Sequence, residues 1–335
     1  MRKLVGVCLV VALGLGVPAA ASSTPKLTHV TFVYNFAPGG YDANLVAAQD
    51  HGFFKAQGLD VSFVVPATGA DPAKLIASGK ADIGLIHSTD VILDRDKGLP
   101  LVSLGATHQY GTLEALCPAS KGVKTLRDLE GKTYGLTGIP ADRVMFEQML
   151  KLNGIPESKL KIVVAGFAGV PQLLAGRIDC YEAISWYEPI LYDLELKKSP
   201  NDTSTYTEIP YYKHKIPRFY TFGLATSQSY LSGHRDLVRH FMTAWSKATQ
   251  WAIANPAAAT DLLVKRYPSL DKTSSLAIWK ASARVVTSPE TKAHCLGWQS
   301  PSVWQAQVQF LLRNKLISKP VSVSQAMTNA FLPCG

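Results

Sequence analysis

The hydrophobic pattern from residue 29 onward alternates short apolar strands with amphipathic helices. Val30–Tyr34 has the apolar and β-branched character of a strand, and Tyr41–Ala56 repeats apolar residues at helical spacing before Gly58. The pattern then predicts strands at residues 59–65, 81–86 and 99–105 and a helix at 71–78, and Ser88 or Thr89 can cap a following helix. This alternation predicts an α/β fold with a largely parallel sheet covered on both faces.

The same alternation starts again after Gly122. It predicts helices at residues 126–129, 143–152 and 170–175 and strands at 132–136, 160–164 and 178–183. A strand-like segment at 218–226 then precedes helices at 234–254, 256–266, 273–285 and 301–314. We expect these last helices to pack back on the first sheet, so that the chain forms two α/β lobes joined by a double crossover hinge.

The expected division follows from this return of the chain. Lobe one is predicted to comprise residues 26–110 and 220–335, and lobe two residues 111–219, with crossings near Gln109–Leu116 and Tyr220–Thr226. In parallel α/β sheets, ligands meet the loops at the carboxyl ends of strands. Two such edges would face each other across the cleft between the lobes.

The first 21 residues have the layout of a secretory signal peptide. Arg2 and Lys3 precede an apolar run from Leu4 to Val17, and small residues follow, so cleavage is expected near Ala21. The run has about 14 residues, whereas a membrane-spanning helix needs roughly 20. A retained membrane anchor is the alternative interpretation.

Composition and charge narrow the class of protein. The 335 residues are 47% hydrophobic and 18% charged, which suffices for two ordinary domains. The formal net charge is +9, but the basic residues are scattered and form no cluster interleaved with aromatic residues. We therefore expect a solvated basic surface, no nucleic-acid partner and a monomer.

Four cysteines remain after the expected cleavage, and they allow three disulfide connectivities. We favour Cys117–Cys180 and Cys295–Cys334, because each pair then falls within one predicted lobe. Buried free thiols are the alternative. No Cys-x-x-Cys or His-x-x-x-His spacing indicates a metal site.

Six motifs lie along nearly the whole expected mature chain. They are Asn35–Asp42, Gly52–Val61 (GFFKAQGLDV), Lys74–Ile83, Leu126–Lys132 (LRDLEGK), Leu174–Asp179 and Thr328–Pro333 (TNAFLP). Together they resemble the periplasmic solute-binding proteins that deliver thiamine pyrimidine precursors, within a superfamily that also serves sulfonates. The resemblance implies a type II periplasmic binding fold, a periplasmic location, a small-molecule ligand and an ABC permease partner in the inner membrane. It implies no catalysis and no cofactor.

Two positions depart from the family pattern. Phe36 stands where the family has Trp, and Asp42 stands where it often has His. Phe36 can still stack on a flat ring, although with less area. Asp42 changes the polar groups that would face the rim of the ligand. A ligand other than formylaminopyrimidine or hydroxymethylpyrimidine is therefore left open as an alternative.

An aminopyrimidine needs aromatic walls for its faces and a carboxylate for its amine and ring nitrogen. The candidates at predicted strand ends are Asn35, Phe36, Tyr41, Asp42, His87, Ser88, Thr89, Thr137, Gly138, Phe167, Trp186, Tyr187 and Glu188. Glu188 is the first choice for the carboxylate, because the family places an aromatic–Glu pair there. The prediction requires Asn35–Asp42 and Trp186–Glu188 to face each other across a gap.

Each of these candidates also has a structural alternative. Trp186 is alternatively a core residue or a lid, Asp42 and Glu188 are alternatively helix-start carboxylates, His87 is a plain hydrogen-bonding residue, and Ser88 and Thr89 are caps.

Two other functions compete with capture of a pyrimidine precursor. An alkanesulfonate or other small anion could be held by Ser88, Thr89 and Thr137 at helix starts, although Glu188 would repel it. The fungal pyrimidine synthases share the fold ancestry and use pyridoxal, but they carry a Cys-rich motif that this sequence lacks. Hydrolase, P-loop and zinc-protease motifs are also missing from the sequence.

Overall fold

A computed structural model describes residues 26–35, 37–66, 71–110 and 113–334 of the chain. The expected signal peptide and Phe36 lie outside these residues. Within them, no helix is both long enough and apolar enough to cross a membrane.

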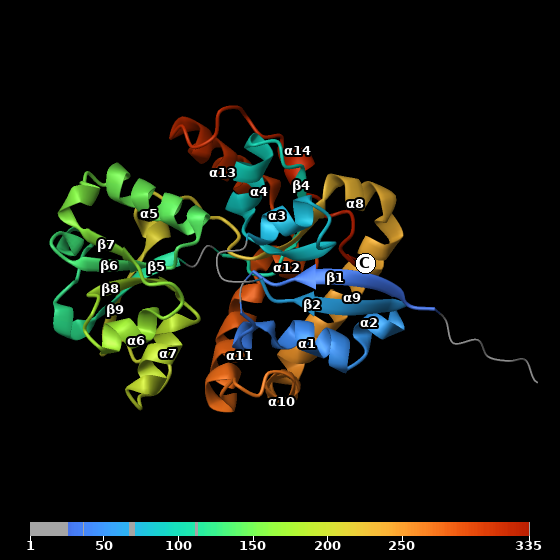
Figure 1. The fold of residues 1–335 in the computed structure, drawn as a ribbon, viewed down its shortest axis with the longest axis horizontal. Helices are drawn as coiled ribbons and strands as arrows, with labels where there is room; N and C mark the ends of the chain where they lie inside the picture. The colour runs from blue at the N-terminus through green and yellow to red at the C-terminus, as the bar shows by residue number, and fades with distance from the viewer. Residues whose placement is uncertain (1–25, 36, 67–70, 111–112, 335) are drawn as a thin grey trace, which may run out of the picture.

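The strands form two five-stranded sheets, one in each lobe (Figure 1). Lobe one has the order β2-β1-β3-β10-β4, and lobe two has the order β7-β6-β8-β5-β9. The strands are β1 (Thr28–Val33), β2 (Leu59–Val64), β3 (Ile83–Ile86), β4 (Leu101–Ala106), β5 (Leu113–Pro118), β6 (Thr133–Leu136), β7 (Lys161–Val164), β8 (Cys180–Ile184), β9 (Tyr206–Pro210) and β10 (Gly223–Ser227). The predicted two-lobed α/β fold with a double crossover is confirmed, and the domain limits remain a prediction.

One strand in each sheet runs against its neighbours. β10 is antiparallel to β3 and β4, and β5 is antiparallel to β8 and β9, whereas β1 pairs in parallel with β2 and β3, and β6 with β7 and β8. Both reversed strands come directly after a crossing between lobes. A chain that arrives from the other lobe enters its new sheet at the cleft edge, where the parallel strands end, and must run away from it.

Helices cover the sheets on both faces (Figure 1). The α-helices are α1 (Ala43–Asp50), α2 (Phe53–Ala56), α3 (Pro72–Ala77), α4 (Ser88–Asp96), α5 (Pro140–Leu152), α6 (Gly169–Leu174), α7 (Glu188–Glu195), α8 (Gln228–Gly233), α9 (Arg235–Ala254), α10 (Pro256–Arg266), α11 (Lys272–Val286), α12 (Pro289–Ala293), α13 (Pro301–Arg313) and α14 (Val323–Ala326). Short 3-10 turns are η1 (Gly40–Asp42), η2 (Ala119–Lys121), η3 (Leu126–Leu129), η4 (Glu157–Lys159) and η5 (Tyr211–Lys213). Helices α8 to α11 and α13 follow the last crossing and return to lobe one, as expected.

The first predicted helix is broken in the structure. Where the pattern predicts one helix over Tyr41–Ala56, the chain forms η1, α1 and α2. Gly52 separates the last two with a φ of 85°, a left-handed conformation that favours glycine. The periodicity predicted the buried face but not the interruption.

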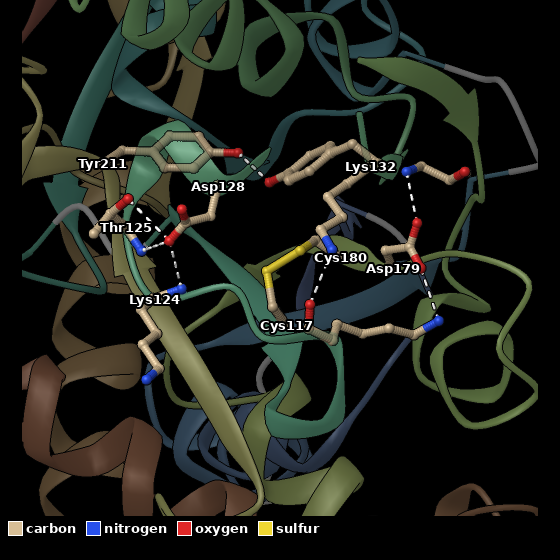
Figure 2. Close-up of a disulfide and its surroundings, with 11 residues drawn as sticks. Cys117, Lys124, Thr125, Asp128, Lys132, Asp179, Cys180 and Tyr211 are labelled. Carbon is tan, nitrogen blue, oxygen red and sulfur yellow. Dashed lines mark hydrogen bonds and ion pairs between the residues drawn. A yellow bond between two sulfur atoms is a disulfide. The ribbon is translucent and has the colours of Figure 1, made fainter. Parts of the chain in front are cut away.

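Both predicted disulfides are present, and each lies within one lobe. Cys117 on β5 is bonded to Cys180 on β8, and Cys295 after α12 is bonded to Cys334 at the C-terminus. Figure 2 shows the first bond among the contacts of lobe two. The hydroxyl groups of Tyr134 and Tyr211 in the same lobe lie 2.9 Å apart. The Cys117–Cys180 bond ties the reversed strand to the centre of its sheet.

Arg218 connects the two crossing segments. Its guanidinium donates to the carbonyl oxygen of Gln109 at 2.8 and 3.0 Å and to Glu290 of α12 at 2.7 Å. Gln109 is fully buried, and its backbone N–H donates to the carbonyl of Val285 at 2.7 Å. The hydroxyl of Ser288 donates to the Gln109 side chain at 3.1 Å. These contacts fix both crossings to lobe one.

Arg218→Met is therefore expected to destabilise the protein. It leaves the buried carbonyl of Gln109 without a donor and removes the ion pair with the part-exposed carboxylate of Glu290. An unsatisfied buried group costs about 1–3 kcal/mol. Urea unfolding of the purified mature chain measures the change. Arg284→Met, at an exposed position of α11, is the control and is expected to change stability by less than about 0.5 kcal/mol. Equal effects of the two variants would contradict this role for Arg218.

Candidate functional site

Aromatic rings from both lobes meet between the two sheets. Tyr41 of lobe one makes edge contacts with Trp186 at 5.4 Å and Tyr187 at 5.6 Å, both from lobe two. The imidazole of His108, which follows β4, stacks on Trp186 at 4.6 Å with an interplanar angle of 9°. Phe222, which precedes β10, lies 5.9 Å from Tyr41 and 6.0 Å from Trp186. The loop after β1 and the loop after β8 therefore face each other.

The rings fill the space between these loops. Trp186 is 3% exposed, and the adjoining cavity, lined by Tyr41, Asp42, His108, Phe222 and others, measures about 10 Å³. That volume holds about one water molecule. The two loops meet, but the gap expected between them is filled by the chain's own rings in this arrangement. A ligand needs the lobes to part.

A close approach of α11 positions Tyr41. A methyl group on Gly40 would lie 2.6 Å from the backbone oxygen of Ser275 and 2.8 Å from Ile278, so only glycine allows this contact. The Tyr41 hydroxyl donates to the carbonyl of Ala37 at 3.0 Å. The close contact with α11 thereby fixes the start of η1, and with it Tyr41, where lobe one meets lobe two.

Asp42 and Glu188 place two buried carboxyl groups beside this cluster. Asp42 accepts from the N–H of Gly39 at 2.9 Å, and burial raises its pKa to about 8. Its other oxygen has no hydrogen-bond partner among the described residues. Glu188 accepts from the N–H of Ile184 at 2.7 Å, and burial likewise raises its pKa to about 8. Both side chains therefore take the helix-start role that the sequence left open, and both remain within reach of the cluster.

A second polar contact joins the lobes at His87 and Asp142. Nδ1 of His87, before α4, lies 3.3 Å from Oδ1 of Asp142 in the first turn of α5, and both side chains are at most 2% exposed. The atoms are at ion-pair distance without the alignment of a hydrogen bond. Burial acts to lower the pKa of His87, but Asp142, together with Asp90 and Glu182, acts in the opposite direction, and the pKa is raised.

Thr137 holds the carboxyl group of Glu182 in lobe two. Its N–H donates to Glu182 at 2.9 Å and its hydroxyl at 2.6 Å. Burial and the neighbouring Asp142 raise the pKa of Glu182. The Thr137 hydroxyl is thus engaged within its own lobe.

The remaining candidates lie away from the ring cluster or are engaged elsewhere. Ser88 donates to Gln307 of α13 at 2.9 Å, and Gln307 donates in turn to the hydroxyl of Thr89. The Asn35 amide donates to the carbonyl of Leu85 at 3.3 Å. Gly138 is exposed, and so is Phe167, at 57%. The structure does not bring Ser88, Thr89 or Gly138 into the cluster.

Sequence reasoning missed His108, Phe222 and Asp142. His108 and Phe222 lie at the two crossings, on the edge of the sheet that faces the cleft. Their position there depends on the reversed directions of β5 and β10, which the sequence pattern did not predict. Asp142 was left outside because the predicted helix began at Arg143, whereas α5 begins at Pro140. The Pro at the first helical position was a usable signal for the earlier start.

Acidic groups predominate among the buried ionisable side chains of the described residues. The buried charged side chains of the described residues include Asp42, Glu114, Asp142, Glu182 and Glu188, but no lysine or arginine. His87 and His108 are the histidines among the buried residues of this part of the chain. Burial lowers the pKa of His108 to about 3, so His108 is neutral.

Comparison with known proteins agrees with this architecture. The sequence pattern of the family described as "NMT1/THI5 like" matches residues 40–259, more than half of the chain. The chain belongs to this family. A formylaminopyrimidine-binding protein from Halalkalibacterium halodurans is 24% identical over 310 residues, covering 92% of each chain. A 4-amino-5-hydroxymethyl-2-methylpyrimidine phosphate synthase, THI13, from Saccharomyces cerevisiae is 25% identical over 246 residues, covering 72% of each. The chain is thus similar both to a binding protein and to a synthase.

A solved structure supports the fold assignment. The alkanesulfonate-binding protein SsuA from Xanthomonas axonopodis pv. citri, bound to MOPS, superposes with a TM-score of 0.64. The match covers 92% of this chain and 99% of that one at 15% sequence identity. At this identity the likeness concerns the fold, the type II periplasmic binding fold expected from the sequence.

Gly40→Ala is expected to disturb the site and to reduce stability. The added methyl group meets backbone at 2.6 Å, and overpacking of this kind costs about 1–3 kcal/mol. Thermal unfolding measures the loss, and near-ultraviolet circular dichroism reports the displacement of Tyr41 and Trp186. Gly233→Ala is the control, because a methyl group there meets nothing within 4 Å. An unchanged aromatic signal in Gly40→Ala would contradict the positioning role of this residue.

Proposed function

We propose that this protein is the extracytoplasmic solute-binding component of an ABC importer and captures a thiamine pyrimidine precursor between its lobes. Hydroxymethylpyrimidine or formylaminopyrimidine is the expected ligand type. The observation that carries the proposal is the stacking of His108 on Trp186 beside two buried carboxyl groups. The proposed location is the periplasm, and the proposed partner is an inner-membrane permease.

The stacked pair supports a flat ligand. The His108 imidazole is itself a planar nitrogen heterocycle, and it lies on the face of Trp186 at 4.6 Å. The two residues come from opposite lobes, so parting the lobes separates the two rings. His108 stays in lobe one, where Ser282 of α11 lies 2.9 Å from its Nε2. A pyrimidine ring that enters there has an aromatic surface on each side.

The carboxyl groups supply the polar edge. Asp42 and Glu188 come from opposite lobes, and both act on Tyr41, whose pKa is raised by burial and by these charges. A carboxylate can accept from the exocyclic amine and from a protonated ring nitrogen of an aminopyrimidine. The free oxygen of Asp42 is available for such a donor. An aminopyrimidine therefore matches both the stacking surface and the polar groups.

An anionic ligand fits the site less well. The three hydroxyl groups considered for an anion, on Ser88, Thr89 and Thr137, bond to Gln307 or Glu182 within their own lobes. Asp42, Asp142 and Glu188 occupy helix starts, where an anion would otherwise meet backbone N–H groups. The likeness to a sulfonate-binding protein concerns the fold alone.

A synthase activity is also less well supported. Pyridoxal enzymes hold their cofactor through a lysine, and no lysine is among the buried residues of the described chain. The four cysteines of the described residues are all in disulfides. These residues do not fit a pyridoxal site, and we propose a protein without enzymatic activity. Purified protein that absorbs as bound pyridoxal would contradict this.

Calorimetric titration of the purified mature protein tests the ligand class. Heat is expected with hydroxymethylpyrimidine or formylaminopyrimidine and none with an alkanesulfonate. Heat only with the sulfonate would reject the pyrimidine proposal and retain a binding role. Absence of heat with all three, in protein that unfolds cooperatively, would leave the pyrimidine assignment without support and require another solute.

Glu188→Gln tests the carboxylate directly. The amide keeps an oxygen for the N–H of Ile184, but it loses the charge that pairs with an aminopyrimidine. A charge-assisted hydrogen bond is worth about 1.5–3 kcal/mol, so affinity should fall by roughly 10- to 150-fold. Glu195→Gln, at the exposed end of the same helix, is the matched control and should bind as the unmodified protein does. Equal affinities in the two variants would remove Glu188 from the site.

A further inference from the structure

His87 and Asp142 form a polar contact that exists only while the lobes touch. His87 precedes α4 of lobe one, and Asp142 lies in the first turn of α5 of lobe two. Their facing atoms are 3.3 Å apart, and both side chains are almost completely buried. The pair adjoins the ring cluster of the proposed ligand site, since Phe222 packs edge-on against His87 at 5.1 Å.

We infer that the His87–Asp142 pair is a proton-linked latch: the lobes close with His87 protonated, and they release that proton when they part. A buried carboxylate without a positive partner is costly, so contact between the lobes favours the imidazolium at this position. Parting the lobes takes Asp142 away. Any burial of His87 that then remains favours the neutral ring.

Other titratable groups also surround His87 on the elements packed against it. Asp90 belongs to α4 itself, and its carboxyl group accepts a hydrogen bond from the backbone N–H of His87. Asp90 therefore stays beside His87 whether the lobes are closed or open. Glu182 of β8 acts from lobe two, but Thr137 holds it with two hydrogen bonds. His108 is neutral and adds no charge. Asp142 is therefore the group whose removal changes His87 most.

The direction of the pH dependence follows from this assignment. In the closed arrangement the pKa of His87 is raised above 6.5, its ordinary value, because Asp142, together with Asp90 and Glu182, outweighs the opposing effect of burial. The protonated His87–Asp142 pair thus stabilises the closed arrangement fully below about pH 6.5. It is lost as the pH rises through the raised pKa. Acidification should close the lobes, and alkaline conditions should open them.

Nuclear magnetic resonance of the histidine rings gives the first test, on the full mature chain with both disulfides and no ligand. The resonance of His87 is assigned as the one missing from His87→Gln. It is expected to titrate above 6.5 in the unmodified protein and below 6.5 in Asp142→Asn. Titration of His87 below 6.5 in the unmodified protein, or an unchanged value in Asp142→Asn, would overturn the latch.

Small-angle X-ray scattering gives the second test. The radius of gyration of the ligand-free protein is expected to fall as the pH is lowered from 8.5 to about 5.5. His87→Gln and Asp142→Asn should each lose the part of this transition that belongs to the latch. His29→Gln and Asp60→Asn are matched controls, because His29 and Asp60 are a pair at 3.4 Å that is exposed and lies within lobe one. The latch is wrong if all four variants share one profile.

A swapped pair separates the latch from a general loss of structure. His87→Asp combined with Asp142→His places both partners in the opposite lobes and is expected to restore the pH-dependent compaction that each single variant loses. Failure of the double variant to regain it, while its unfolding stays cooperative, would overturn the proposal. The inference rests on the proposed function only in requiring lobes that move. Because neither test uses a ligand, the latch and the ligand assignment can fail separately.

Discussion

The two crossings of the chain between the sheets determine where the chemistry of this protein lies. Each crossing enters its new sheet at the cleft edge, which forces β5 and β10 to run against their neighbours. The residues just outside these reversals, His108 and Phe222, consequently lie at the same edge as the loops after the parallel strands. Arg218 binds the backbone of Gln109 and so holds the two crossings together. Without this arrangement, Tyr41 and Trp186 would have no shared neighbours.

The sequence predicted the regular parts of this fold because local patterns specify them. Strand–helix alternation located most elements within a few residues, and the two disulfides follow once each cysteine pair is placed in one lobe. The direction of β5 and β10 was not predictable in this way, because it depends on which edge the chain enters. The same holds for the His87–Asp142 contact: each residue sits at an ordinary helix start, and only the packing of the lobes shows that they meet.

Carboxyl groups of the chain itself occupy helix starts along the cleft. Helix starts at a sheet edge are natural anion sites, and the likeness to an alkanesulfonate-binding structure shows that this fold can host an anion. Here carboxyl groups from the chain itself stand at those positions, and no buried lysine or arginine compensates them in the described residues. Fold and ligand preference are thus specified by different residues: glycines and apolar positions specify the first, and Asp42, Asp142 and Glu188 oppose an anion.

Burial of these carboxyl groups also explains why lobe contact and ligand capture can use the same side chains. With a pKa of about 8, Asp42 and Glu188 are mostly protonated at neutral pH while the rings fill the gap. Each aromatic pair contributes about 0.5–1.5 kcal/mol beyond its buried area, which is small beside the several kcal/mol needed to bury an unpaired ion. The empty closed arrangement is therefore compatible with protonated carboxyl groups, and a ligand that brings N–H donors replaces those protons. A sulfonate brings no such donor, so it cannot replace those protons, and closing the lobes around it would bury its negative charge without a buried lysine or arginine among the described residues.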